Sequence, residues 1–186
     1  VICVDEKSKQ ILEQLRAPIP ASPGHPVKED CEYKRAGTRN IFMAVEPKGG
    51  CRQVEVTTRR TKGDCVQFIG HLVKKVYVRA RKIHLVLDNL NTHFRSSFEE
   101  ILGVKEATQM LERVEFHYTP KHASWLNMAE IEIGIMDRQC TGCRIPNEKT
   151  LRSEVAAWTD RRNQAKSTID WKFTRQDADQ KLSRYY

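Results

Sequence analysis

KIHLVLDNLNTH, residues 82–93, is the stretch of sequence that decides the fold. Residues 83–87 form a short, mostly apolar run that predicts a strand buried on both faces. The run ends at Asp88, which is followed by Asn89 and, five residues on, by His93. Open α/β sheets place their chemistry just past the carboxyl ends of buried strands, so Asp88 is either a catalytic or metal-binding carboxylate or a residue that caps the following turn.

Composition indicates a globular chain with a basic surface. The 186 residues suffice for one domain with its own core, and their formal net charge is +8. Clustered Lys and Arg at 59–62, 74–82 and 161–162 favour a polyanionic partner, although such clusters are also typical of solvated faces. No apolar run is long enough to span a bilayer and no signal peptide opens the sequence, so we expect a cytoplasmic protein without a membrane partner.

The six cysteines are scattered, which predicts reduced thiols rather than a disulfide framework. Only Cys140 and Cys143 have the spacing of a zinc-ligand pair. No second pair lies near them in the sequence, and Gly142 between them is typical of a helix end. We therefore expect no zinc.

The order of predicted elements indicates an α/β, ribonuclease-H-like fold, with a five-stranded mixed sheet flanked by helices. Apolar runs predict strands over 1–5, 41–45, 53–57, 83–87 and 114–118, the first three as an antiparallel meander with a turn at 47–50. Helical spacing predicts four helices, which begin at Asp64, at Ser96 or Ser97, at Trp125 and at Asn147.

Two other segments carry expectations of their own. Residues 10–37 are rich in Pro and predict a long loop with a short helical turn at 11–16. The first strand begins at Val1 without an initiator Met, which predicts that the chain is a piece of a longer protein.

Two more acids occupy positions comparable to that of Asp88. Asp5 ends the first predicted strand. On the helix over 125–139, Glu130 and Glu132 lie on opposite shoulders of an apolar stripe, and periodicity does not choose between them. Glu130 shares its side with Asn127 and Gly134, a small polar surface that suits a metal and a phosphate, and this favours Glu130. Either glutamate is also typical of a solvated helix edge.

Four blocks together resemble a known family: VDEKS at 4–8, DCEYKRAGT at 30–38, LDNLNTH at 87–93 and YTPKHASWLNMAE at 118–130. They resemble the insertion-sequence-630 transposases, bacterial relatives of the mariner elements with an acid-triad (DDE) endonuclease domain. The segment IDWKFT at 169–174 also resembles the tail of that family. The resemblance covers residues 1–186 as a catalytic domain, and the helix-turn-helix region that the family places ahead of it is missing.

The resemblance implies that Asp5, Asp88 and Glu130 form the catalytic, metal-binding triad. Phosphodiester cleavage and strand transfer require two divalent ions, which a bridging carboxylate flanked by one further carboxylate for each ion would hold. We assign Asp5 as the bridge and expect Mg²⁺, with Mn²⁺ as a substitute, because both prefer hard oxygen ligands.

Polar residues near these acids are candidates for orienting the ligands or contacting DNA, with ordinary structural roles as the alternative. These candidates are Asn89, His93, Lys121, His122 and Asn127. Trp125 is expected to anchor the core rather than to stack on a base.

The resemblance implies double-stranded DNA as the partner, both as element ends and as a target containing TA, with a homodimer as one assembly state and the bacterial nucleoid as the location. Two alternative functions stay open. One is a ribonuclease-H-like nuclease that only hydrolyses, and the other is a decayed DNA-binding fragment without catalysis.

Overall fold

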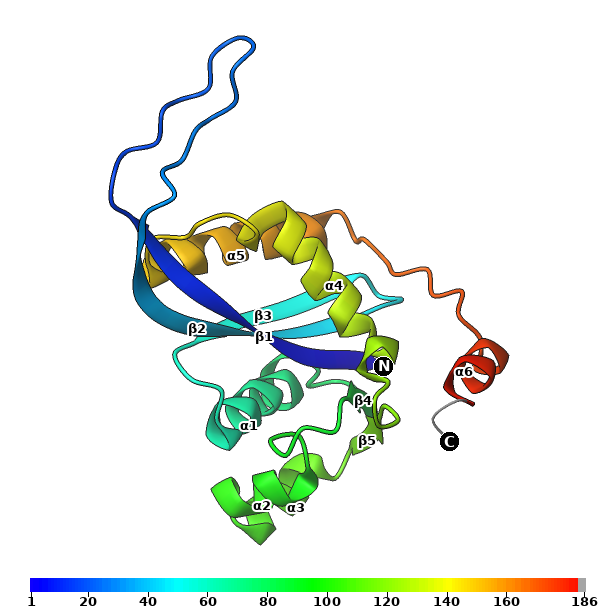
Figure 1. Cartoon of the computed structure of the whole chain (residues 1–186). Coiled ribbons are helices and arrows are strands. Elements are labelled where there is room, and N and C mark those ends of the chain that lie inside the picture. The colour runs from blue at the N-terminus through cyan, green and yellow to red at the C-terminus, as the bar shows by residue number, and fades with distance from the viewer. Residues whose placement is uncertain (184–186) are drawn as a thin grey trace.

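The computed structural model describes residues 1–183 and contains a five-stranded sheet in the order β3-β2-β1-β4-β5. The first three strands are antiparallel, whereas β4 runs parallel to β1 and to β5. The strands are β1 (Ile2–Gln14), β2 (Tyr33–Glu46), β3 (Cys51–Thr57), β4 (Ile83–Leu87) and β5 (Val114–Tyr118). Helices flank this mixed sheet, so the predicted ribonuclease-H-like architecture is confirmed (Figure 1).

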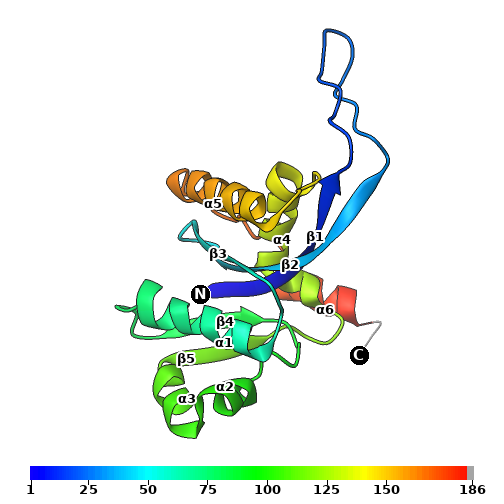
Figure 2. The same cartoon turned by 90° about the vertical axis from the view of Figure 1, so that its left-hand side faces the viewer.

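Side chains alternate along β2 and divide the core between the two faces of the sheet. Phe42 and Ala44 pack on the face covered by α1 (Lys62–His71), α2 (Arg95–Leu102) and α3 (Val104–Leu111). Ile41 and Met43 pack on the face covered by α4 (Met128–Met136) and α5 (Glu148–Gln164). Figure 2 shows α1 and α5 on opposite sides of the sheet. Each large side chain buried in this way contributes roughly 1.5–3 kcal/mol.

Strand β4 is buried on one face only, which corrects the prediction of a doubly buried strand. Ile83, Leu85 and Leu87 are buried against the helices of the α1 face, but His84 and Val86, which alternate with them, are half-buried. The side chain of His84 is 38% exposed. The opposite face of β4 and β5 is therefore open to solvent in part.

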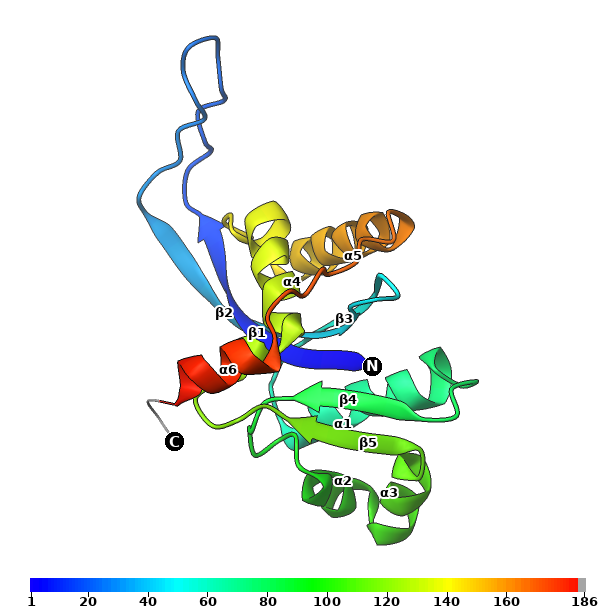
Figure 3. The same cartoon turned by 90° about the vertical axis from the view of Figure 1, so that its right-hand side faces the viewer.

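The first two strands are longer than predicted. Pairing extends from Cys3 opposite Val45 to Gln14 opposite Tyr33, with one shift of register between Gln10 and Leu12. The helical turn predicted at 11–16 is wrong, because pairing with β2 satisfies this backbone and buries Ile11 in the core. The predicted loop shrinks to residues 15–32, which project from the body as an arm (Figures 1 and 3).

Helix ends differ from the predicted ones where tertiary contacts compete with local caps. Thr61 rather than Asp64 caps α1, while Asp64 bonds back to Thr61 in a capping box. Neither Ser96 nor Ser97 caps α2; Ser97 is buried and donates to the carbonyl of Asn91 instead. Helix α3 was not predicted, and Gly103 with φ of +79° separates it from α2.

The helix predicted over 125–139 is divided into three pieces. A 3-10 turn (Ser124–Leu126) precedes α4, and a π-helix (Asp137–Thr141) follows it and ends at Gly142. A second π-helix (Leu72–Val76) extends α1. The cap of α5 by Asn147 is confirmed, since its side chain accepts from the amide of Thr150 at 2.8 Å. Helix α6 (Arg175–Leu182) completes the chain, and no helix in residues 1–183 is long and apolar enough to cross a membrane.

Candidate active site

Asp5 lies inside β1 rather than at its predicted end, because pairing with β2 extends this strand to Gln14, and Asp88 directly follows the neighbouring strand β4. Strand β1 pairs in parallel with β4, with Ile2 opposite Leu85 and Cys3 opposite Val86. The printed pairing ends there, but the same offset continued by two residues leads to Asp5 and Asp88, and the charge of Asp88 acts on the carboxyl of Asp5. By alternation, both side chains belong to the face that α4 covers. The sheet therefore brings together two acids that are 83 positions apart in the sequence.

Glu130 lies near Asp5 because the buried side chain of Asn127, at the start of the same helix, forms a hydrogen bond with β1. Asn127 caps α4 by accepting from the amide of Ala129 at 3.2 Å. Its amide nitrogen donates to the carbonyl of Val4 at 2.8 Å, next to Asp5. Ala129 packs against Cys3. Glu130 follows in the first turn of α4, half-buried, and within residues 1–183 its carboxylate takes no hydrogen bond or ion pair.

The pKa of the Asp5 carboxyl depends on its burial and on these neighbouring residues. Asp5 is 8% exposed, and the pKa of its carboxyl is raised to about 7, with burial as the largest cause. The amide of Glu6 lowers this pKa by donating a hydrogen bond of 2.8 Å, and the negative charges of Glu6, Asp88 and Glu130 raise it. Four carboxylates thus lie close enough to act on one another electrostatically.

His93 is fully buried between two acids. Its Nε2 lies 3.0 Å from Oε2 of Glu6, and its Nδ1 lies 2.7 Å from Oδ1 of Asp88, as an ion pair that is not aligned as a hydrogen bond. Burial alone would lower the pKa of His93, but the contacts with Asp88 and Glu6 outweigh burial and raise it to about 9. The raised pKa favours the charged form of His93, which lies fully buried against the carboxylate of Asp88.

Asp88 has the turn-capping role as well. Its Oδ1 accepts from the amide of Leu90 at 3.1 Å. Burial would raise the pKa of Asp88, but His93 and this amide lower it below its ordinary value. Asp88 is thus held ionised, while Asp5 resists ionisation.

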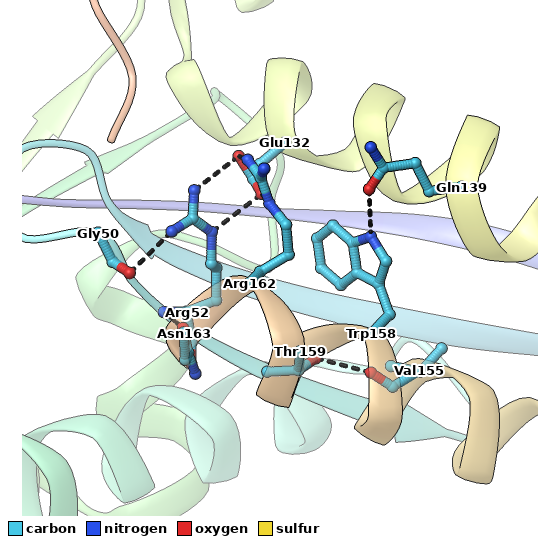
Figure 4. Close-up of polar contacts among 9 residues, drawn as sticks. All are labelled: Gly50, Arg52, Glu132, Gln139, Val155, Trp158, Thr159, Arg162 and Asn163. Carbon is cyan, nitrogen blue, oxygen red and sulfur yellow. Dashed lines mark hydrogen bonds and ion pairs between the residues drawn. The ribbon is translucent and has the colours of Figure 1, made fainter. Parts of the chain in front are cut away.

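Glu132 has a different environment from Glu130, although the two residues share a helix. Its carboxylate is fully buried and accepts hydrogen bonds from Arg52 of β3, at 2.9 and 3.0 Å, and from Arg162 of α5, at 2.8 and 3.1 Å (Figure 4). Burial would raise the pKa of Glu132, but the two guanidinium groups lower it. Glu132 is committed to a structural ion network, and Asp5 experiences the charge of Glu130 instead.

The remaining predicted residues lie on the loops that follow β4 and β5. Asn89 is exposed and donates to the carbonyl of Thr119, which links the two loops. Lys121 and His122 are exposed on the turn after β5, and His122 has φ of +61°. Trp125 is not a core anchor: it is half-buried, with Phe173 at 5.1 Å and the ammonium of Lys181 at 4.9 Å from its ring.

Sequence reasoning missed two residues of this site. The side chain of Glu6 is completely buried and contacts His93, and Arg60 lies 3.6 Å from its second oxygen. The sequence does point to Glu6, because this residue directly follows Asp5, the acid that ends the first predicted strand. Alternation sends it to the opposite face from Asp5, however, so the pattern alone did not include it in the site.

A ribonuclease-H-like sheet with acids gathered at one strand end is typical of metal-dependent nucleases. A family model described as DDE superfamily endonuclease matches residues 1–152, and the chain belongs to this family. The family predicted from the sequence blocks is thereby confirmed, and its members use divalent metal ions.

Among solved structures, the chain is similar to the crystal structure of the Mos1 strand transfer complex, with a TM-score of 0.55 and 13% sequence identity. The match covers 86% of this chain and 46% of that chain, so the present chain spans about half of its structural relative. This likeness supports the fold. No curated protein matches the sequence.

Proposed function

We propose that this chain is the catalytic domain of a transposase, which cleaves DNA strands at the ends of an insertion sequence and joins the freed 3′ ends to a target. The observation that carries the proposal is the meeting of Asp5, Asp88 and Glu130 from two parallel strands and one helix. Family membership supports phosphodiester chemistry.

The three carboxylates fit a pair of divalent ions. They offer hard oxygen ligands, and the pKa of Asp5 is raised first by burial and then by the charges of neighbouring acids, both of which a bound cation would offset. Asp5 would bridge both ions, and Asp88 and Glu130 would each complete one site, with Mg²⁺ as the expected ion and Mn²⁺ as a substitute. When bound, such ions activate a water or a 3′-hydroxyl and stabilise the leaving oxygen.

The chain's own residues prepare these ligands. His93, held by Glu6, fixes the carboxylate of Asp88 in its ionised form. Asn127 fastens the first turn of α4 to β1, so that Glu130 faces Asp5 from a rigid helix rather than from a loop. The unprotonated form of Asp5 is the one that would hold metal.

Double-stranded DNA is the proposed partner, both as element ends and as a target with TA. The formal net charge of +8 and the exposed clusters that include Arg59, Arg60, Lys74 and Lys75 support a phosphate-binding surface. Asn89, Lys121 and His122 are the exposed candidates on the loops that follow β4 and β5. A homodimer is the proposed assembly, and the nucleoid in the bacterial cytoplasm is the proposed location.

Strand joining distinguishes a transposase from a nuclease that only hydrolyses. The test supplies a longer protein, with an end-binding region restored upstream, with labelled pre-cleaved element ends and a TA-containing plasmid in Mg²⁺ or Mn²⁺. We expect covalently joined products. Efficient cutting without joining would favour the nuclease, and DNA binding without either reaction would favour the decayed fragment.

Asp88→Asn is the matched control, since it keeps the size of the side chain and removes one ligand charge. We expect both cleavage and joining to disappear while DNA binding persists. If this variant cut DNA at the parent's rate, the assignment of Asp88 would have to be abandoned.

A further inference from the structure

A second group of metal-ligand side chains lies on the open face of β4 and β5. His84 lies opposite Glu115 in the parallel register, and His117 follows two residues along β5 on the same face. Nδ1 of His84 lies 2.9 Å from Nε2 of His117. Oxygens of Glu115 lie 3.8 Å from His84 Nδ1 and 3.4 Å from His117 Nε2. One ligand atom from each side chain therefore falls within 4.8 Å of the others.

We propose that His84, Glu115 and His117 form a binding site for a transition-metal ion of the Zn²⁺ class. Two imidazoles and a carboxylate are a common ligand set for zinc with an open position. Imidazole ligands suit Zn²⁺, Cu²⁺ or Ni²⁺ and disfavour Mg²⁺, so this site would not take the ions expected at the acid triad.

The geometry requires only a small adjustment. Two nitrogens at about 2.05 Å from a tetrahedral ion are about 3.4 Å apart, so the imidazoles must separate by about 0.5 Å. In the metal-free protein one of the facing nitrogens carries a hydrogen, which moves to the outer nitrogen of its ring when the ion binds. The side chains are 38%, 42% and 44% exposed, which leaves a path for the ion and a fourth position for water.

This site is separate from the acid triad. His84 precedes Asp88 by four residues on the same strand, a distance of about 13 Å along an extended chain. The earlier expectation of no zinc depended on the cysteines alone, and it missed this cluster because only strand register brings the three residues together.

Lys82 competes with the ion for Glu115. Its ammonium forms an ion pair with Oε2 of Glu115, and this contact is the main reason that the pKa of Glu115 lies below its ordinary value. Lys82 is exposed and flexible enough to turn away. The Lys82→Ala variant should therefore bind the ion more tightly than the parent.

Calorimetric titration of the whole chain with Zn²⁺, in excess Mg²⁺, tests the proposal. We expect one equivalent to bind and the melting temperature to rise by about 5 °C when free Zn²⁺ is a hundredfold above Kd, because the ion binds only the folded strands. His84→Ala and His117→Ala should each lower the affinity about 100-fold or more, since loss of a mere hydrogen-bond partner of a ligand costs 10–100-fold. Circular dichroism would establish that both variants fold.

The Cys140→Ser, Cys143→Ser double variant is the matched control and should bind Zn²⁺ as the parent does. Co²⁺ in place of Zn²⁺ gives a spectrum that reports the ligand set directly. Absence of binding by the parent would overturn the proposal. So would unchanged affinity in the His84→Ala, His117→Ala double variant.

Discussion

Asp5 destabilises the fold that holds it. Its pKa is about 7 in the folded chain against an ordinary value of 3.8, so the folded state binds the proton more tightly than the unfolded state does. Linkage then requires stability to fall as the pH rises from about 4 to about 7. A buried acid surrounded by other acids is thus a sign of function, since it contributes nothing to stability at neutral pH.

Replacing Asp5 should make the metal-free protein more stable. Asp5→Asn removes the buried charge and keeps the oxygen that accepts from the amide of Glu6. We expect the free energy of unfolding at pH 8 to rise by about 1–4 kcal/mol, with less than half of that gain at pH 5. Thermal unfolding in a chelator measures the difference, and DNA cleavage should be lost.

The two proteins must be compared at each pH, because His93 also titrates. Its pKa is raised to about 9, so its stabilising contribution is complete below pH 6.5 and disappears as the pH rises toward 9. Lower stability of the Asp5→Asn variant at pH 8 would contradict the proposed environment of Asp5.

At the scale of the element, α4 carries two glutamates with opposite roles. Glu130 faces the other acids without a protein partner in residues 1–183, whereas Glu132 joins Arg52 and Arg162 across the interfaces with β3 and α5. The network in Figure 4 holds α4 against the sheet. Helix α4 therefore carries a proposed metal ligand, Glu130, and is held in position by the buried ion pairs of Glu132.

The two glutamates form a matched pair of variants. Glu130→Gln should abolish cleavage and leave stability within about 0.5 kcal/mol of the parent. Glu132→Gln leaves two guanidinium groups without their counterion, one of them completely buried, and should lower stability by about 3–5 kcal/mol. Urea unfolding and a nicking assay at low temperature, where the weaker variant is still folded, separate the two effects. If Glu132→Gln abolished cleavage at full stability, the choice of Glu130 would be wrong.

At the scale of the whole molecule, acidic and basic residues lie in different regions: the acids at the proposed metal site and many basic residues on the exposed surface. The acids gather around Asp5 of β1 and Asp88 just past β4, while much of the basic excess lies on exposed loops and helix ends such as Arg59 and Lys75. Some basic residues are not available to a partner, because Arg52 and Arg162 are bound to Glu132. The number of free cations is thus smaller than the composition implies.

The affinity for DNA should depend on the exposed Lys and Arg residues and not on the acid triad. In a chelator, Asp88→Asn should bind DNA as the parent does, and affinity should fall at least about 100-fold between 50 and 200 mM salt. Arg59→Ala should reduce the slope of log affinity against log salt by about 1. Fluorescence anisotropy measures both. Affinity that does not change with salt would show that phosphate contacts do not dominate binding.

Local patterns in the sequence determined the elements and the family. Strands β4 and β5 were predicted with their observed bounds, and Asn147 was predicted as a helix cap, because apolar alternation and capping act over a few residues. The spaced blocks around Asp5, Asp88 and Glu130 identified the family that the comparison confirms. The long β1–β2 pairing was missed, since its partners are distant in the chain and its composition is that of a loop.

Periodicity did not separate Glu130 from Glu132, and the sequence favoured Glu130 only through its neighbours and the family resemblance; the tertiary structure shows that the two side chains have different environments. The two lie on equivalent shoulders of α4, and the difference between them comes from Arg52 and Arg162, which are 80 and 30 residues away. The burial of Glu6 and His93 beneath Asp88 and the meeting of His84 with Glu115 and His117 have the same origin. Each depends on strand register and on charges brought close through folding, and the energy of a buried charge is set by neighbours in space rather than by neighbours in sequence.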